Sequence, residues 1–239
     1  MIKLQRFKNR RQAGALLAQR LGMYGGRDDV LILALPRGGV PVGVMIARQL
    51  DVALDVLIVR KLGMPSQPEV ALGAIASGGL RLLRPDLMKL TGVSMDAINA
   101  IAERESLEVT RRETLYRAGR PDLSLHDRTV ILVDDGVATG ATMLAAVHVV
   151  REAGPARLII AVPVAPAETI QMLRPEVDEL ICLRTPEPFH AVGIWYDRFQ
   201  QVGDDEVARL LERADRAGGR RLGSLPATLD RLPNQRHQG

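Results

Sequence analysis

The sequence of 239 residues is poor in the side chains that cross-link a chain or bind zinc. It has a single cysteine, Cys182, so no disulfide can form within the chain. Its four histidines are scattered through the sequence at positions 126, 148, 190 and 237. A structural zinc site needs several such ligands at short spacing. These shortages exclude a disulfide framework and a zinc-binding fold, and they fit a reducing compartment.

Long apolar segments are also missing. The basic N-terminal stretch MIKLQRFKNRRQ lacks the apolar region of a signal peptide. No apolar run approaches the roughly 18 residues that are needed to span a bilayer. We therefore expect a soluble cytoplasmic protein with no membrane partner.

Charge of one sign is concentrated at the end of the chain. From residue 213 onward there are six arginines and two aspartates, which account for the whole net charge of +4, so the remaining body is formally neutral. We interpret residues 213–239, rich in Gly, Pro and Arg, as a basic, flexible tail. Nucleic acid is therefore not the expected partner, although a phosphate-binding arm stays open as an alternative.

Short apolar runs alternate with segments of helical spacing. The apolar runs predict strands over 30–35, 55–60, 71–77, 129–134, 157–164 and 179–183. Helical spacing predicts helices over 9–21, 40–50, 94–118 and from the fourth strand to about residue 153, whereas 61–69, with two prolines, predict a loop. Alternating strands and helices indicate an α/β fold with a doubly wound, mainly parallel sheet, built as one domain over 1–212.

Two unusual loops are expected to meet in this fold. Ligands of such sheets bind at the carboxyl ends of the strands, where the strand order reverses. In the usual order, 3-2-1-4-5, the first and fourth strands are neighbours at that point. The loops that follow them are PRGG, 36–39, and DDGVATGAT, 134–142. The sequence therefore predicts a ligand site between these loops.

The second loop combines two kinds of chemistry. In ILVDDGVATGATM, 131–143, a strand ends on Asp134 and Asp135, and a small-residue loop then opens a helix. Amides at a helix N-terminus, with the hydroxyls of Thr139 and Thr142, can bind a phosphate. Two carboxylates would repel that phosphate and instead suit a neighbour that offers hydroxyl donors or carries a metal. A ribose with a 5-phosphate and a bound Mg²⁺ satisfies both requirements.

These residues resemble a known family. ILVDDGVATGATM resembles the phosphoribosyl pyrophosphate (PRPP) motif of type I phosphoribosyltransferases, and is closest to that of the adenine enzymes, which also have Ala-Thr-Gly. LPRGG, 35–39, resembles the pyrophosphate loop of the family, and RKLGMP, 60–65, is similar to the Arg-Lys pair before its flexible catalytic loop. The resemblance implies a type I fold with a hood, to which we assign a C-terminal segment at about 185–212. We also expect an inserted helical hood at about 80–120, whose long helix has no counterpart that we can match in the base-specific enzymes.

The resemblance also implies roles for individual residues. Asp134 and Asp135 would act in catalysis and hold Mg²⁺, directly or through water and PRPP. Lys61 would assist catalysis, and Glu69, on a lid over 62–70, is either a proton-handling group or a solvated loop acid. The 5-phosphate would be bound by Val137, Ala138, Thr139, Gly140, Ala141 and Thr142, and the pyrophosphate by Arg37, Gly38, Gly39, Arg60 and Lys61.

The acceptor of the ribosyl group is less clearly marked. Four of the seven aromatic residues lie within EPFHAVGIWYDRF, 187–199. This segment resembles the purine-stacking hood of hypoxanthine and guanine enzymes, which makes Phe189, Trp195, Tyr196 and Asp197 candidate acceptor-binding residues. A hydrophobic cluster that ties this segment to the sheet is the alternative.

Two departures leave the acceptor unassigned. Ala138 stands where hypoxanthine and guanine enzymes have an aspartate. The helix over 94–118, with Arg111, Arg112 and Arg117, is either a hood that reads an acidic acceptor or an exposed, salt-bridged helix.

We expect Mg²⁺-dependent transfer of a 5-phosphoribosyl group from PRPP to a nitrogen acceptor, most simply a nucleobase, by a homodimer that releases pyrophosphate. Two alternatives stay open: a non-catalytic regulator that senses PRPP or a nucleotide on the same fold and binds nucleic acid, and a hydrolase that uses the same site.

Overall fold

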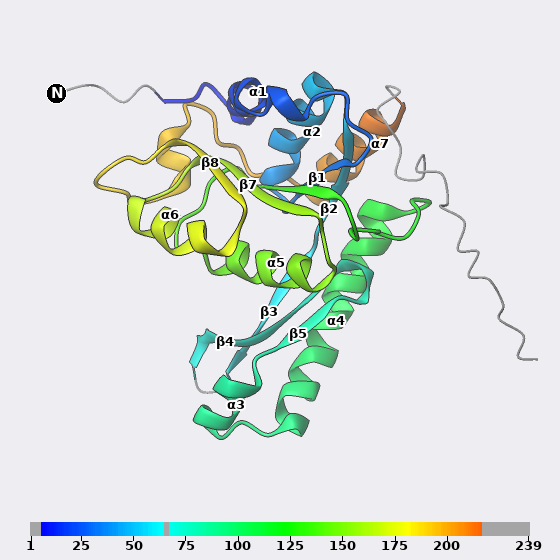
Figure 1. The fold of residues 1–239 in the computed structure, drawn as a ribbon, viewed down its shortest axis with the longest axis vertical. Helices are drawn as coiled ribbons and strands as arrows, with labels where there is room; N and C mark the ends of the chain where they lie inside the picture. Colours follow the sequence, from blue (N-terminus) through cyan, green and yellow to red (C-terminus); the bar gives the residue numbers. More distant parts are fainter. Residues whose placement is uncertain (1–5, 65–66, 217–239) are drawn as a thin grey trace, which may run out of the picture.

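The computed structural model describes residues 6–64 and 67–216, without the side chains of 67–70. It consists of a five-stranded sheet with helices on both faces, and of a smaller three-stranded sheet with two helices that projects from one side (Figure 1). Most of the predicted basic tail lies outside the described residues.

The main sheet is parallel throughout, in the order β2-β1-β6-β7-β8. Its strands are β1 Val30–Ala34, β2 Ala53–Val56, β6 Thr129–Val133, β7 Arg157–Val164 and β8 Glu179–Arg184. All residues of β1, β2 and β6 are buried, because helices cover both faces. The predicted α/β fold with a doubly wound, mainly parallel sheet is confirmed, and so is the adjacency of the first and fourth predicted strands.

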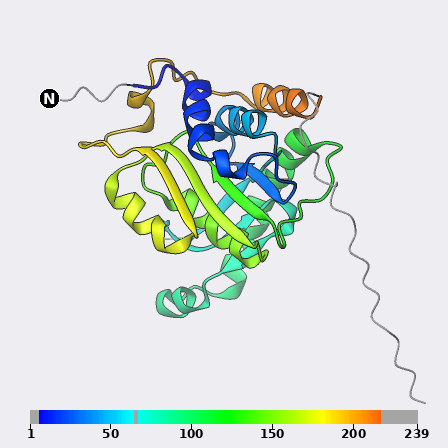
Figure 2. The same ribbon diagram turned by 45° about the horizontal axis from the view of Figure 1, so that its top comes forward.

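Helices form a layer on each face of this sheet. On one face lie α1 Arg10–Arg20, α2 Gly39–Leu50 and α7 Asp204–Arg216, and on the other lie α5 Ala141–Glu152 and α6 Ala167–Leu173 (Figures 1 and 2). Helix α1 begins where the Asn9 side chain accepts a hydrogen bond from the Gln12 amide at 3.0 Å. Short 3-10 helices occur at Gly22–Tyr24, Ser77–Gly79, Arg174–Glu176 and Val192–Trp195.

The smaller sheet corrects three sequence expectations. It contains β3 Val59–Met64, β4 Gln67–Ala76 and β5 Arg81–Leu83, all antiparallel. The loop predicted over 61–69 is wrong for its described residues, because 61–64 lie on β3 and 67–69 lie on β4. The strand predicted over 55–60 is divided between the two sheets, and the strand near 71–77 exists but lies outside the main sheet. The pairing slips between Leu62 and Met64, near the two prolines that suggested a loop.

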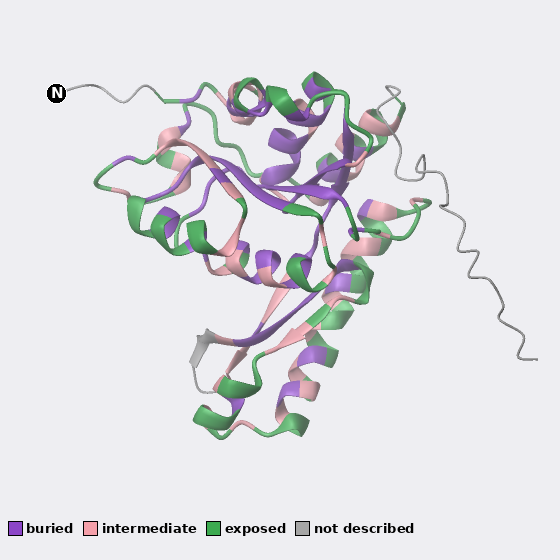
Figure 3. Ribbon diagram, in the orientation of Figure 1, coloured by how far each residue is buried: buried purple, intermediate pink, exposed green. Residues whose placement is uncertain are grey.

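Helices α3 Pro85–Thr91 and α4 Met95–Arg117 complete the projecting part. The Ser94 hydroxyl accepts from the Ala97 amide at 3.2 Å, so the predicted start of the long helix is confirmed. Residues of α4 are buried where it packs on β3, β4 and α7, whereas the outer end of the projection is largely exposed (Figure 3). The projection begins at Val59, before the expected insert at about 80–120.

The arginines of α4 form ion pairs within the chain. Arg111 and Arg112 both contact Glu108, and Arg111 also reaches Asp204. Arg117 binds the fully buried Asp55 at 3.0 Å. The alternative of a salt-bridged helix therefore accounts for these three side chains.

Helix α7 crosses the expected start of the tail. It runs from Asp204 to Arg216, so residues 213–216 are helical and pack with the main domain. Its buried Val207 and Leu211 join the core. Beyond them, Ala214 packs against the core and Asp215 pairs with Arg120, which explains why the helix continues past residue 213. In the described ranges, no helix combines the length and the apolar character needed to cross a membrane.

The Asp55 carboxylate is the buried centre of a charge cluster. Arg117 and Arg120, each with a side chain only 9% exposed, bind it from the end of α4 and the following loop. Replacing Asp55 with Ala leaves two guanidinium groups without their shared partner. We expect the free energy of unfolding, measured with urea, to fall by about 3–5 kcal/mol.

The matched control is Glu212→Ala, which removes the exposed pair between Glu212 and Arg216. Exposed pairs of this type contribute about 0.3–0.5 kcal/mol. Equal losses in the two variants would contradict a structural role for the Asp55 cluster.

Candidate functional site

The acid pair follows directly after β6, at the carboxyl end of the main sheet. The Asp135 amide donates to Asp134 Oδ1 at 2.8 Å, which turns the chain away from the strand direction. Asp135 is buried, with 9% of its surface exposed, and Asp134 is half-buried. The two carboxylates therefore lie against the protein interior, where β6 ends.

The loop Pro36–Gly39 packs against this pair from the neighbouring strand. Its Pro36–Arg37 peptide is cis. A Cβ atom placed on Gly38 would stand 2.1 Å from Asp135 Oδ2, and one on Gly39 would stand 2.6 Å from the Val133 carbonyl oxygen. Only glycine permits this approach. The expectation that the two loops face each other is confirmed by these contacts, and a ligand site between them stays a prediction.

Arg10 is a site residue that the sequence did not reveal. From the first turn of α1, its Nε donates to Asp135 Oδ2 at 2.7 Å, and Nη1 donates to the Gln200 carbonyl at 2.8 Å. Its guanidinium lies 3.8 Å from the centroid of the Phe199 ring. Arg10 and Asp135 are 125 residues apart in the sequence. The sequence signal for Arg10 is only its place in a basic segment at the start of an amphipathic helix.

The electrostatics of the pair are unequal. Loss of contact with water raises the pKa of the Asp134 carboxyl well above its usual range, and the charge of Asp135 raises it further. Burial also raises the pKa of Asp135, but the charge of Arg10 opposes that shift. In the described part of the chain no basic side chain pairs with Asp134. Asp134 is therefore the acid that would gain most from a ligand that brings hydroxyl donors or a cation.

The start of α5 provides an anion-binding geometry beside the acids. Gly140 is the N-cap, with φ at 79°, and no side chain caps the first turn. The amides of this turn have no acceptor within the helix. Ala138, Thr139 and Thr142 are exposed, so the small-residue loop leaves the amides open to a phosphate.

Val137 contributes differently from its neighbours. Its side chain is buried, and its amide donates to the Val164 carbonyl at 2.9 Å. The Thr169 hydroxyl fixes the same loop by donating to the Ala138 carbonyl at 2.6 Å. The Val137 amide therefore anchors the loop to β7 and is not free to bind a phosphate. Ala138 through Thr142 remain as the candidate cradle.

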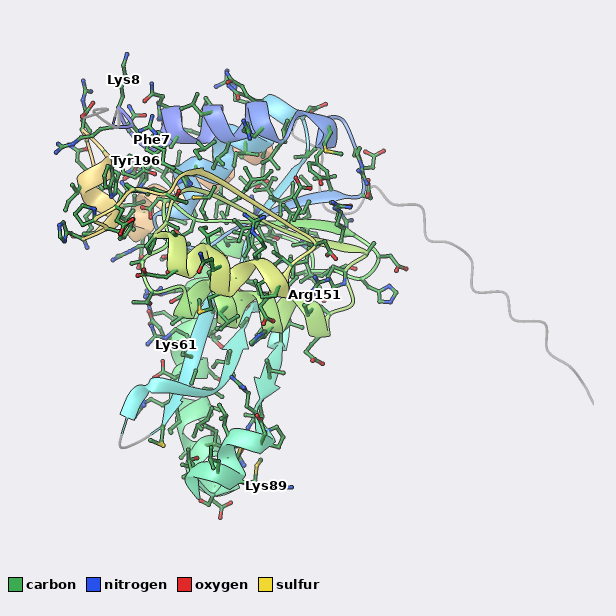
Figure 4. The ribbon with its side chains drawn as sticks, turned by 60° about the vertical axis from the view of Figure 1, so that its left-hand side comes forward. Phe7, Lys8, Lys61, Lys89, Arg151 and Tyr196 are labelled. Carbon is green, nitrogen blue, oxygen red and sulfur yellow. The ribbon has the colours of Figure 1, made fainter. Side chains whose placement is uncertain are left out.

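The expected pyrophosphate residues are only partly brought together. Arg37 lies in the site loop, and its guanidinium approaches the Asp204 carboxylate at 3.5 Å. Arg60 lies on β3, where Glu105 of α4 binds it at 2.7 Å. Lys61 follows on the projecting sheet, away from the cluster that contains Phe7 and Tyr196 (Figure 4). Glu69 lies on β4, and its side chain is outside the described residues. The lid expected over 62–70 is thus mostly a hairpin.

The aromatic segment is tied to the site from the C-terminal side. Tyr196 is buried, packs 5.4 Å from Phe7 between ring centroids, and donates its hydroxyl to the Asp135 carbonyl at 2.5 Å (Figure 4). Phe189 and Trp195 are partly buried against this cluster, and Asp197 is exposed. The hydrophobic-cluster alternative therefore describes Tyr196, whose hydroxyl is committed to the acid loop.

The donor set agrees with a shared Mg²⁺ site. Among the described residues, no group of three or more His, Cys, Asp or Glu side chains could hold a metal alone. Mg²⁺ is usually bound by one or two carboxylates together with substrate phosphates and water. Asp134, with Asp135 behind it, fits that arrangement and not a protein-only cage.

Comparison with known proteins agrees with this geometry. Residues 4–192 match the model of the phosphoribosyl transferase domain. A Mycobacterium tuberculosis protein, provisionally named a phosphoribosyl transferase, is 44% identical over 210 residues, and the match covers 88% of this chain and 47% of that relative. The chain thus spans about half the length of this relative.

A solved structure is similar over nearly its whole length. The protein TT1426 from Thermus thermophilus is 42% identical and superposes with a TM-score of 0.81, covering 87% of this chain and 99% of TT1426. The family match covers more than half of the chain and includes both loops of the site. The chain belongs to the phosphoribosyl transferase domain family.

Proposed function

We propose that this chain transfers the 5-phosphoribosyl group of PRPP to a nitrogen acceptor and releases pyrophosphate, with Mg²⁺ as cofactor. The observation that carries the proposal is the contact of the Gly38–Gly39 backbone with the Asp134–Asp135 pair, beside the uncapped start of α5. This contact supports the proposal because it brings the two acids and a second backbone loop together near the start of α5.

Each part suits one portion of PRPP. The amides of Ala138 through Thr142 and the exposed threonine hydroxyls bind the 5-phosphate. Asp134 accepts hydrogen bonds from the ribose hydroxyls, while Arg10 and Tyr196 hold Asp135 behind it. The loop at Arg37, Gly38 and Gly39 presents its backbone to the pyrophosphate.

Catalysis then consists mainly of positioning and electrostatics. The lone pair of an acceptor nitrogen forms the new bond to the anomeric carbon. The bond from that carbon to the pyrophosphate oxygen breaks, and pyrophosphate leaves with the electron pair. When bound, Mg²⁺ supplies positive charge that neutralises the leaving group.

The β3–β4 hairpin takes the role that we expected of a loop lid. Arg60 is held by Glu105 in this structure, so binding pyrophosphate requires it to exchange that carboxylate for phosphate oxygens. Lys61, next to it, supplies a second cation, and Glu69 stays a candidate for proton handling. Closure of the hairpin over the site would exclude water, which competes with the acceptor.

For the acceptor we propose only a chemical class, the nucleobases. A nucleobase nitrogen fits the reaction, and Phe189, Trp195 and Asp197, near the carboxyl end of the sheet, are the candidate contacts. We also propose that the chain acts as a homodimer in the cytoplasm.

The direct test measures pyrophosphate release from PRPP and Mg²⁺ with a panel of purines, pyrimidines and phosphorylated acceptors. We expect acceptor-dependent release, and we expect Asp134→Asn to lower kcat/KM at least about 100-fold, because the site loses a charge that stabilises the reacting ribose. Asp86→Asn, on the exposed α3, is the matched control.

Three outcomes distinguish the rival functions. Release that depends on an acceptor supports the transferase. Binding of PRPP without release under any acceptor would replace the proposal with a sensor on the same fold. Release that is equally fast without an acceptor would indicate a hydrolase.

Gly38→Ala tests the contact between the two loops. The added Cβ meets Asp135 Oδ2, so either the loop or the acid must move. We expect the affinity for PRPP, measured by calorimetry, to fall at least about 10-fold, the scale of one lost charge-assisted hydrogen bond. Gly22→Ala is the control, because its Cβ meets nothing within 4 Å. Unchanged affinity in Gly38→Ala would separate this loop from PRPP binding.

The raised pKa of Asp134 predicts a pH-dependent cost in stability. A folded-state pKa above the usual 3.8 means that the stabilising contribution is full below that value and is lost as pH rises through the folded pKa. Asp134→Asn removes this loss. We expect its Tm to exceed that of the parent by about 2–4 °C at pH 8 and by less at pH 5.

The measurement is calorimetric unfolding in EDTA without PRPP, with Asp86→Asn again as the control. If the Tm of Asp134→Asn at pH 8 were equal to or below that of the parent, the charged Asp134 carboxylate would not destabilise the free protein.

A further inference from the structure

A groove distinct from the candidate site lies beside α2, where Leu54 of the edge strand β2 also lines it. This groove, of about 900 Å³, runs between α1, α2, α7 and the loop at 119–121. The three helices form one layer over the sheet (Figures 1 and 2). Apolar side chains line part of it, among them Val44, Met45, Leu54 and Leu210. Its size lies within the range of small-molecule sites.

Arginines make the groove cationic. Arg11, Arg48 and Arg213 line it and are exposed, and in the described ranges no carboxylate pairs with any of them. A fourth, Arg120, also lines the groove and is bound to Asp55 and Asp215. The lining thus holds four arginines and two aspartates, Asp51 and Asp215, and Asp215 is already paired with Arg120. The uncompensated charge is positive.

This combination selects a class of ligand. Guanidinium groups bind phosphate oxygens in a two-pronged geometry, and they also stack on planar rings. The apolar surface suits the base and sugar carbons of a nucleotide. We propose that the groove binds a nucleoside phosphate, with Arg48 and Arg213 on the phosphate.

The groove is separate from the PRPP site. Its lining includes none of the candidate residues of that site. It extends along α2 to Asp51 and Val52, which lie at the amino end of β2, whereas the acid pair lies at the carboxyl end of β6. The groove also reaches Pro41 in the first turn of α2, whereas Arg48 lies about 13 to 14 Å from Gly39 along the helix at 1.5 Å per residue.

Two helices connect the groove to the pyrophosphate loop. Helix α2 begins at Gly39, directly after the loop, and carries Arg48 in its last turn. Helix α7 begins with Asp204, which pairs with Arg37, and carries Arg213 in its last turn. A ligand held by both arginines therefore fixes the two helices that position the loop. This regulatory part rests on the proposed function, and the binding part does not.

Calorimetric titration of the full chain with AMP and GMP in EDTA tests the binding part. We expect two nucleotides per chain, one in the groove and one at the PRPP site. The double variant Arg48→Glu/Arg213→Glu should weaken the groove site at least about 10-fold, because two charge-assisted contacts become repulsive. Gly38→Ala should affect only the other site. Arg20→Glu, on the exposed side of α1, is the charge-matched control.

The outcomes separate this proposal from the proposed function. If the titration shows the site that the arginine reversals weaken but no Gly38-dependent site, nucleotide binding in the groove is established. That result would hold even if the chain is not a transferase. No nucleotide binding up to about 1 mM, or one site that the arginine reversals leave unchanged, would overturn the groove proposal. Arg48→Gln/Arg213→Gln repeats the test if the reversal lowers Tm.

Hydrogen exchange tests the coupling without relying on activity. We expect AMP or GMP, at a concentration that fills the groove but not the weakened PRPP site of Gly38→Ala, to slow exchange of the amides of residues 37–39 in that variant. We expect no slowing in the arginine double variant combined with Gly38→Ala. Nucleotide binding in the groove with no change at these amides would overturn the coupling between the two sites.

Discussion

The close approach of the Gly38–Gly39 backbone to the Asp134–Asp135 pair is the constraint on which the site depends. It requires parallel pairing of β1 with β6, so that both loops leave the sheet at the same edge. It also requires two residues without Cβ atoms, because the space that a side chain would need is filled by a carboxylate and a backbone carbonyl. Two neighbouring acids at a buried strand end are costly, and the structure offsets that cost more for Asp135, which pairs with Arg10, than for Asp134.

The two ends of the domain meet around these acids. Arg10 reaches Asp135 from α1, while the Tyr196 hydroxyl binds the carbonyl of the same residue from the C-terminal side. The contacts of Phe7 with Tyr196, and of Arg10 with Phe199, join the same two segments. The aromatic residues near the C-terminus therefore stabilise the acid loop, which gives their clustering in the sequence a structural reason whatever the acceptor is.

The projecting sheet is attached through charge as well as apolar packing. Asp55, on the edge strand β2 of the main sheet, binds Arg117 and Arg120. Glu105 of α4 binds Arg60 of β3. Asp204 joins Arg37, Arg111 and Tyr116. The candidate pyrophosphate residues Arg37 and Arg60 thus both have carboxylate partners on other elements. A pyrophosphate bound by the Arg60 side chain would compete with Glu105, which links ligand binding to the position of α4.

The sequence by itself determined the parallel strands, the acid pair and the small-residue loop, because each depends on local patterns: continuous apolar runs, turn residues and helix starts. It also located the two loops that meet. Only the tertiary structure decided that 61–64 and 67–69 lie on two paired strands, since strand pairing can override the local effect of proline. It alone decided that Val137 is an anchor, that Tyr196 points to a backbone carbonyl and that Arg10 neutralises Asp135. These roles depend on contacts between residues far apart in the chain, and no local pattern encodes which distant side chain will meet a buried charge.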